Sequence, residues 1–205
     1  MYLFFKRIFD FISSLILFII ISPLFLILWV LVRIKHGKPA FFTQIRTGKG
    51  MKAFSIIKFR TMTEERDEKG NYLPDEKRVT PLGKFLRSTS LDELPELISI
   101  IKGDMSVIGP RPLPVTYDAY YTEREKLRFN VRGGLIPPEV LYNNIQPTWD
   151  EQLEYEAQYG ENVSFLLDLR IIVAVFKGLL KRFNSNYGEY VREGLNIERQ
   201  GRDKK

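Results

Sequence analysis

Two adjacent carboxylates, Asp92 and Glu93, have the residue types and the spacing that phosphoryl transfer needs. They lie in the sequence SLDELPELISIIKG, residues 90–103. An ionised aspartate can attack phosphorus, as carboxylates do in aspartyl-phosphate enzymes. A carboxylate beside that nucleophile is a natural ligand for magnesium, a hard cation that binds few protein oxygens. The spacing therefore permits a nucleophile at Asp92 and a Mg²⁺ site formed by Glu93 with Asp92.

The same carboxylates have a simpler interpretation as the start of a helix. Ser90 followed three residues later by Glu93 matches a capping box, and Pro95 is typical of a first helical turn. Acidic residues in a first turn usually only complement the helix dipole, so the motif alone favours this interpretation. Asp92, Glu93 and Glu96 then point away from the core. The predicted core face consists of Leu91, Leu94, Leu97, Ile98 and Ile101.

Basic residues elsewhere in the chain favour phosphate chemistry. Lys58 and Arg60 close a short predicted strand. Arg87 lies one turn before the carboxylates, and Arg111 stands in a proline-stiffened loop after them. Taken singly, each cation is more simply a solvated surface residue. Together they can converge on a doubly charged diphosphate, and beside them Asp92 is expected to stay ionised at neutral pH.

Composition limits the remaining chemistry. The net charge of +6 suits an anionic surface such as lipid headgroups, nucleic acid or a phosphorylated substrate. The absence of cysteine excludes disulfides, thiolate metal sites and cysteine nucleophiles, and it fits a domain exposed to the cytoplasm. His36 is the only histidine, which argues against histidine-based triads and multi-histidine metal sites. Catalysis must therefore depend mainly on carboxylates, lysines, arginines or hydroxyls.

The chain also contains a long apolar segment, FISSLILFIIISPLFLILWVLV at residues 11–32, without a charged residue. It is long enough to cross a bilayer core of roughly 30 Å, and too long for the apolar region of a signal peptide. Pro23 removes a helical hydrogen bond, which predicts a kink beside Ser22, with Ser13, Ser14 or Ser22 as partners for the freed carbonyls. Basic residues flank both ends, so a kinked transmembrane helix and a re-entrant hairpin stay open.

The rest of the pattern predicts an α/β fold, mostly helical with a small β-hairpin, built as one globular domain beside the apolar segment. The helix at 164–183 is either a core helix or an interfacial one. We expect a membrane segment at 1–36, a catalytic domain at 37–183 and a polar, mobile tail at 184–205. The predicted elements are a β-hairpin at 40–62, a solvated loop at 64–78, helical segments at 81–103, 117–129 and 164–183, and an extended loop at 104–115.

At SLDELPELISIIKGDMSVIGPRPL, residues 90–113, the chain resembles the signature of the bacterial sugar transferase family, the monotopic phosphoglycosyl transferases of the PglC type. KFRTM at 58–62, the Ser-Pro pair of the apolar segment and SFLLDLRI at 164–171 match in the same order. The resemblance extends to about Arg182.

The resemblance implies a re-entrant membrane helix broken at Ser22-Pro23. It also implies that Asp92 attacks the β-phosphate of a UDP-sugar, which releases UMP and leaves an aspartyl-phosphosugar that undecaprenyl phosphate then accepts. Glu93 would help hold Mg²⁺, and Asp168 would support the site. The residues predicted to bind substrate or to brace the site are Lys58, Arg60, Arg87, Arg111, Arg132 and Asp168.

The implied location is the bacterial inner membrane, with a compact catalytic domain and amphipathic interfacial helices on the cytoplasmic face. The implied partners are the lipid bilayer, a polyprenyl phosphate and a nucleotide-sugar. Downstream glycosyltransferases or a second copy of the chain are further candidate partners. A basic nucleic-acid-binding protein is set aside, because that hypothesis explains neither the apolar segment nor the carboxylates.

One region, RGGLIPPEVLYNNIQPTW after Val131, departs from the family pattern. Asn144 stands where the family carries an arginine associated with nucleotide binding, and an amide lacks the charge and forked donors of a guanidinium. The identity of nucleotide and sugar therefore stays open. Trp149 or Tyr142 can stack on a base, although such aromatics more often belong to the core. The alternative function is a catalytically silent, membrane-bound module that binds a nucleotide-sugar or a partner enzyme.

Overall fold

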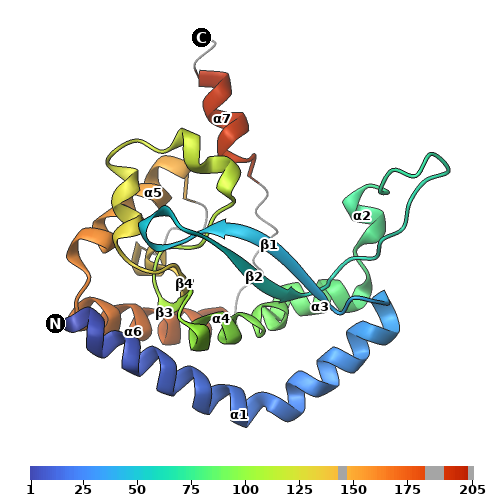
Figure 1. Cartoon of the computed structure of the whole chain (residues 1–205), viewed down its shortest axis with the longest axis horizontal. Coiled ribbons are helices and arrows are strands. Elements are labelled where there is room, and N and C mark those ends of the chain that lie inside the picture. Colours follow the sequence, from blue (N-terminus) through green and yellow to red (C-terminus); the bar gives the residue numbers. More distant parts are fainter. Residues whose placement is uncertain (143–146, 183–191, 203–205) are drawn as a thin grey trace. The chain divides into compact units, whose positions relative to one another are not determined.

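The computed structural model describes the chain except residues 143–146, 183–191 and 203–205 (Figure 1). It forms two compact units. Unit 1 consists of Met1–Asp10, Ile45–Phe54 and Gly103–Lys205, and unit 2 of Phe11–Gln44 and Ser55–Lys102. The elements are mostly helices, as the sequence predicts, together with two small sheets.

Helix α1 (Tyr2–His36) contains the predicted membrane segment, and it bends in its middle (Figure 1). Pro23 has no N–H to donate to the carbonyl of Ile19 four residues earlier. Ser22 Oγ donates to that same carbonyl at 2.8 Å. Because one hydroxyl replaces the missing donor, the predicted break at Ser22-Pro23 is a bend inside one continuous helix. Within the described residues, α1 is long and apolar enough to cross a membrane, and little of it is buried.

Strands β1 (Phe41–Thr47) and β2 (Ala53–Phe59) confirm the predicted hairpin. The turn between them is η1 (Lys49–Met51), where Gly50 has φ 64°. In unit 2, the rings of Phe25, Phe41 and Phe59 lie against one another. The buried side chains that complete this core are Leu28, Val32, Ala40 and Leu86.

The helical segment predicted at 81–103 is three short elements: α3 (Pro81–Thr89), η2 (Leu91–Glu93) and α4 (Glu96–Lys102). Thr80 caps α3 by accepting from the N–H of Gly83, and Pro81 occupies its first turn. A Cβ at Gly83 would come within 1.8 Å of the Thr61 carbonyl oxygen, so α3 packs directly on the backbone after β2. The predicted loop at 64–78 contains the short helix α2 (Asp75–Arg78).

Unit 1 contains a second sheet that the sequence analysis did not predict. Strand β3 (Ser106–Ile108) pairs in parallel with β4 (Gly134–Ile136), with Ser106 opposite Gly134 and Ile108 opposite Ile136. The segment predicted to be helical at 117–129 forms two short 3-10 helices. These two are η3 (Val115–Tyr120) and η4 (Glu125–Asn130). The helices that follow in this unit are η5 (Pro138–Tyr142), α5 (Trp149–Asn162), α6 (Phe165–Arg182) and α7 (Leu195–Arg202).

The two helices that follow α5 differ in how they pack. In α6 the apolar residues Phe165, Leu169 and Phe176 are exposed, while Asp168 is buried. This distribution favours the interfacial interpretation of α6 over the core interpretation. Helix α7 lies in the segment predicted to be a mobile tail, yet its first residue, Leu195, has 0% exposed surface.

Candidate active site

The dyad in unit 2 is held by a lysine from the end of β2. Lys58 Nζ lies 2.6 Å from Glu93 Oε1 and 3.2 Å from Glu96 Oε1. The side chains of Lys58 and Glu93 each keep 19% of their surface exposed, whereas Glu96 keeps 4%. The prediction that Glu96 points away from the core is wrong, because its carboxylate is buried and pairs with the partly exposed Lys58. Lys58 therefore orients two carboxylates of the segment 91–96.

The predicted capping box at Ser90 is also wrong. Ser90 ends α3 in the left-handed conformation, φ 57°, and its side chain makes no capping hydrogen bond. Because a single residue separates α3 from η2, the backbone of Ser90 terminates the earlier helix and cannot adopt the extended conformation of an N-cap. The carboxylate of Glu93 turns instead to Lys58. The capping role that the sequence suggested for Glu93 is thereby removed, while Asp92 and Glu93 still lie in a first helical turn.

Asp92 is half-buried at the start of η2. Burial, and next to it the negative charge of Glu93, raise the pKa of Asp92 above its ordinary value, while Lys58 and Arg87 offset part of the rise. Arg87 is oriented by a bond of 2.9 Å from its Nε to Thr61 Oγ1. The expectation that Asp92 stays ionised depends only on the cations around it. Desolvation is the larger influence on its ionisation in the folded protein.

Arg60 belongs to the same unit but has other partners. Its Nη1 donates to the Pro39 carbonyl at 2.9 Å and lies 3.6 Å from Glu64 Oε1. The side chain is 8% exposed. These contacts attach the residues after β2 to the connection between α1 and β1.

Three predicted site residues lie in unit 1. The side chain of Arg111 is exposed, and its backbone N–H donates to Glu156 Oε1 at 3.0 Å. Arg132 Nε donates to the Gly103 carbonyl at 2.7 Å. Asp168 is buried and accepts hydrogen bonds, each of 2.6 Å, from Lys6 Nζ and Tyr159 Oη, as well as one from Tyr2. Asp168 thus fastens α6 to the first turns of α1 inside unit 1.

The donor set of the dyad can be compared with what magnesium requires. Within the described part of the chain, no group of three or more histidine or acidic side chains forms a closed metal cage. Mg²⁺ is commonly held by one or two carboxylates together with substrate phosphates. Asp92 and Glu93 fit that donor set, and a cation beside them would relieve the repulsion that helps to raise the pKa of Asp92.

The aromatic candidates for base stacking have partners within the protein. Trp149 is buried, and Arg192 lies over its ring, 3.5 Å from the centroid. Its membership of the core confirms the simpler expectation. Tyr142 stacks on Tyr155 with ring centroids 3.7 Å apart. Asn144 lies outside the described residues.

Unit 1 contains a buried ion pair that the sequence does not predict, between Arg128 and Glu156, whose charged atoms are 2.6 Å apart. Glu139, whose pKa is raised to about 8 by burial and by the charge of Glu156, is likewise not predicted. No periodicity links these residues, because η4, η5 and α5 come together only in the folded unit. The available signal for Glu156 was its helical spacing, because it follows Trp149 by seven residues and Leu153 by three and so falls on the same face of α5.

Comparisons with known proteins show the family to which the chain is similar. The family model described as bacterial sugar transferase matches residues 1–182. The uncharacterized sugar transferase EpsL of Bacillus subtilis is 41% identical over 85% of this chain and 87% of its own length. The UDP-glucose:undecaprenyl-phosphate glucose-1-phosphate transferase of Klebsiella pneumoniae is 36% identical over 87% of this chain, which corresponds to 41% of that protein. A UDP-N-acetylgalactosamine-undecaprenyl-phosphate N-acetylgalactosaminephosphotransferase of Aeromonas hydrophila is 33% identical over 90% of this chain and 45% of its own length.

Proposed function

The chain belongs to the bacterial sugar transferase family, and we propose that it transfers a sugar 1-phosphate from a UDP-sugar to undecaprenyl phosphate, the step that initiates polysaccharide assembly. Relatives of this chain are named for that transfer. The observation that carries the proposal is the arrangement around Asp92. Its carboxylate lies beside Glu93 and in the field of Lys58 and Arg87, all within the residues that the family model matches.

The arrangement supports transfer in two steps. In the first step, an oxygen of Asp92 forms a bond to the β-phosphorus of the donor, and the bond from that phosphorus to the bridging oxygen breaks. UMP leaves with the electron pair, and a phosphosugar stays on the aspartate. In the second step, a phosphate oxygen of undecaprenyl phosphate attacks the same phosphorus and releases the carboxylate. Lys58 and Arg87 neutralise negative charge that develops on the phosphates.

We propose Mg²⁺ as the cofactor, held by Glu93 with Asp92 and by the phosphates of the donor. When bound, the ion neutralises charge on the diphosphate and favours departure of UMP. Lys58 holds the carboxylate of Glu93 in one orientation, 2.6 Å from its ammonium nitrogen. Substrate phosphates that compete for Lys58 would free Glu93 for the ion.

We also propose that the protein acts at the cytoplasmic face of the bacterial inner membrane, with α1 as a re-entrant helix. Support comes from the apolar length of α1, its bend at Ser22-Pro23 and the exposed apolar residues of α6. Undecaprenyl phosphate is a membrane lipid, so a catalytic domain at headgroup depth would meet it. A downstream glycosyltransferase or a second copy of the chain as partner stays a prediction.

The decisive experiment incubates the purified protein in lipid nanodiscs with undecaprenyl phosphate, Mg²⁺ and a panel of nucleotide-sugars, and measures the release of nucleoside monophosphate. Release of UMP with one or more UDP-sugars is expected. Mass spectrometry of the wild type with donor alone should detect a phosphosugar on the peptide that contains Asp92, and Asp92→Asn should show neither adduct nor turnover.

The alternative of a silent binding module predicts a different result. It would bind a nucleotide-sugar without releasing any monophosphate from a donor in the panel. Normal turnover by Asp92→Asn would show that another group is the nucleophile, while the transfer itself would stand.

A further inference from the structure

A cavity of about 260 Å³ lies inside unit 1, between the first turns of α1, strand β3 and the start of α6. Because every residue that lines it belongs to unit 1, the cavity is complete within that unit. Its volume is close to the lower limit of ligand pockets, roughly 300 Å³, so it accommodates part of one chain of a ligand. The apolar side chains that form its walls include Phe5, Phe9, Val107, Ile108, Leu169 and Ile172.

Polar side chains also border this cavity, but they bind one another. Lys6 Nζ lies 2.6 Å from Asp168 Oδ2, and the hydroxyl of Tyr2 donates to the same carboxylate oxygen. Asp10 accepts the backbone N–H of Val107 at 3.1 Å. The surface that faces the cavity is therefore almost entirely apolar. Burial of the polar groups of a nucleotide or a sugar here would be unfavourable, whereas a hydrocarbon chain needs no hydrogen-bonding partner.

The rim of the cavity is continuous with the apolar surface of the membrane segment. Phe5 and Phe9 of α1 and Phe165 of α6 line the cavity and are also exposed. Phe4 and Ile8 extend the exposed apolar surface along the first turns of α1. Helix α1 is long and apolar enough to cross a membrane. The bilayer around such a helix supplies hydrocarbon chains to an apolar cavity that opens beside it.

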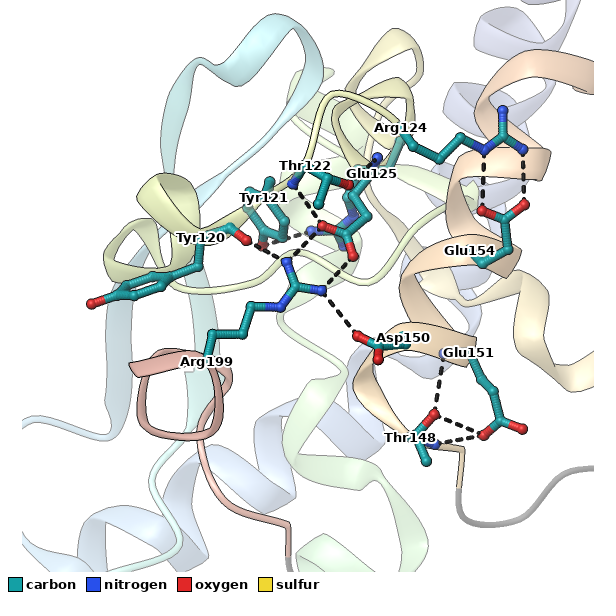
Figure 2. Close-up of polar contacts among 11 residues, drawn as sticks. Tyr120, Tyr121, Thr122, Arg124, Glu125, Thr148, Asp150, Glu151, Glu154 and Arg199 are labelled. Carbon is teal, nitrogen blue, oxygen red and sulfur yellow. Dashed lines mark hydrogen bonds and ion pairs between the residues drawn. The ribbon is translucent and has the colours of Figure 1, made fainter. Parts of the chain in front are cut away.

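A second cavity in unit 1, of about 530 Å³, differs in its lining, which includes charged side chains. Figure 2 shows the guanidinium of Arg199 directed at Glu125 and Asp150. The guanidinium of Arg124 pairs with Glu154. These charges are satisfied within the fold, whereas apolar walls that face an empty space lose their dispersion contacts. The apolar cavity is therefore the stronger candidate for a bound ligand.

We infer that the apolar cavity binds a fatty-acyl chain of a bilayer phospholipid, which fills the space between the start of α1 and α6. A phospholipid is the favoured occupant because bilayer lipids surround an embedded α1 and the cavity offers contacts to a hydrocarbon chain alone. The bound chain keeps water from the ion pair of Lys6 with Asp168, which strengthens the connection between the two helices. The inference goes beyond the proposed transfer, because Asp92 and its neighbouring cations belong to unit 2.

Photolabelling tests whether an acyl chain enters the cavity. The full chain is placed in vesicles of phosphatidylethanolamine and phosphatidylglycerol that contain a phosphatidylethanolamine with a diazirine at the end of one acyl chain. Phe4 is exposed on α1 and serves as the internal reference for contact with the bilayer. Ile108 has 3% exposed surface and lines the cavity, so label on the β3 peptide requires a chain inside it. Label confined to exposed residues of α1 and α6 would overturn the inference.

A variant with a filled cavity sharpens this test. Ile172→Trp should lower the label on β3, relative to Phe4, by about tenfold, the loss expected when roughly two methylene groups of the chain are no longer buried. Leu166→Trp is the matched control, because it adds the same side chain to the exposed surface of α6 and should leave this label unchanged. Should Ile172→Trp fail to fold, Val107→Phe fills the cavity from β3, with the same expected result. Undiminished label in a folded, filled variant would overturn the inference.

A competition experiment separates a phospholipid from the polyprenyl acceptor. Undecaprenyl phosphate, added as a minor component, should lower the label on β3 only in proportion to its share of the lipid. A larger decrease would identify the polyprenyl chain as the occupant and overturn the assignment to a phospholipid. No nucleotide-sugar is needed, so label on β3 supports the inference even if the wild type releases no nucleoside monophosphate. Absence of the label in an active enzyme would leave the proposed transfer intact.

Discussion

The ion pairs of the two units differ in how deeply they are buried. Lys58 and Glu93 in unit 2 each keep 19% of their side chain exposed, whereas Arg128 and Glu156 in unit 1 keep 1% and 0%. A partly exposed pair contributes up to about 1 kcal/mol to stability, while removal of one partner of a buried pair costs roughly 3–5 kcal/mol. Glu93 of the proposed catalytic dyad is therefore held by an ion pair that costs little to break. The ion pair of Glu156, which accepts the backbone N–H of Arg111, costs more to break.

This contrast suits the proposed reaction. An incoming diphosphate must compete with Glu93 for Lys58. Because this ion pair is weak and partly exposed, Lys58 can exchange the carboxylate of Glu93 for a phosphate. The next four experiments test this contrast.

The first experiment compares stability losses in the two units. Arg128→Met leaves Glu156 as an uncompensated buried charge, so we expect a loss of about 3–5 kcal/mol in the free energy of unfolding. Glu93→Gln breaks the more exposed of the two ion pairs of Lys58, leaves Lys58 paired with Glu96, and should cost less than about 1 kcal/mol. Urea unfolding in detergent, followed by tryptophan fluorescence, measures both. Equal losses would show that the two pairs are not held differently.

The second experiment uses the pH dependence of transfer. Asp92 must be ionised to attack, and its raised pKa predicts that activity falls on acidification at a higher pH than for an ordinary aspartate. Glu93→Gln removes a negative neighbour, so the residual activity should persist to lower pH. Lys58→Gln removes a positive neighbour and should lose activity at higher pH. Shifts in the same direction in both variants would contradict the assigned electrostatics, and Lys84→Gln on the exposed side of α3 is the control.

The third experiment concerns Glu139 in unit 1. Its folded pKa of about 8, above the ordinary value of 4.5, means that the folded state favours the protonated acid. The stabilisation from this group is fully present below the unfolded pKa and is lost as the pH rises through the folded value. Glu139→Gln keeps a neutral side chain, so its Tm should fall less than that of the wild type between pH 6 and pH 9. An unchanged difference would mean that another group titrates.

The smallest effect is expected in α1. Ser22→Ala removes the hydroxyl that replaces the missing donor of Pro23, and comparable side-chain bonds in membranes contribute roughly 0.6 kcal/mol. A slight decrease of Tm in nanodiscs is expected. A loss as large as that of Arg128→Met would indicate that Ser22 has a role beyond this bond.

Labels at residues 2 and 205 should both react only from the cytoplasmic side, which tests the re-entrant arrangement in the same samples.

Sequence patterns predicted those parts of the fold that depend on neighbours along the chain. The apolar run, the kink at Pro23 and the hairpin around Gly50 follow from hydropathy, from a missing donor and from turn residues, all of which act over a few positions. The sheet of β3 and β4 was not predictable in this way. Its strands have three residues each and pair across an intervening segment, so they are too short to produce a periodic pattern.

The features of the candidate site also separate into those determined by local sequence and those decided by tertiary packing. By itself the sequence determined the dyad of Asp92 and Glu93, the basic residues near it in the chain and the family, because continuous motifs carry them. Only the tertiary structure decided that Ser90 is no cap, that Glu96 is buried against Lys58, and that Arg111 is held between two charged side chains from distant helices. The reason is that ion pairs and desolvation depend on which surfaces pack together, and no local spacing records that.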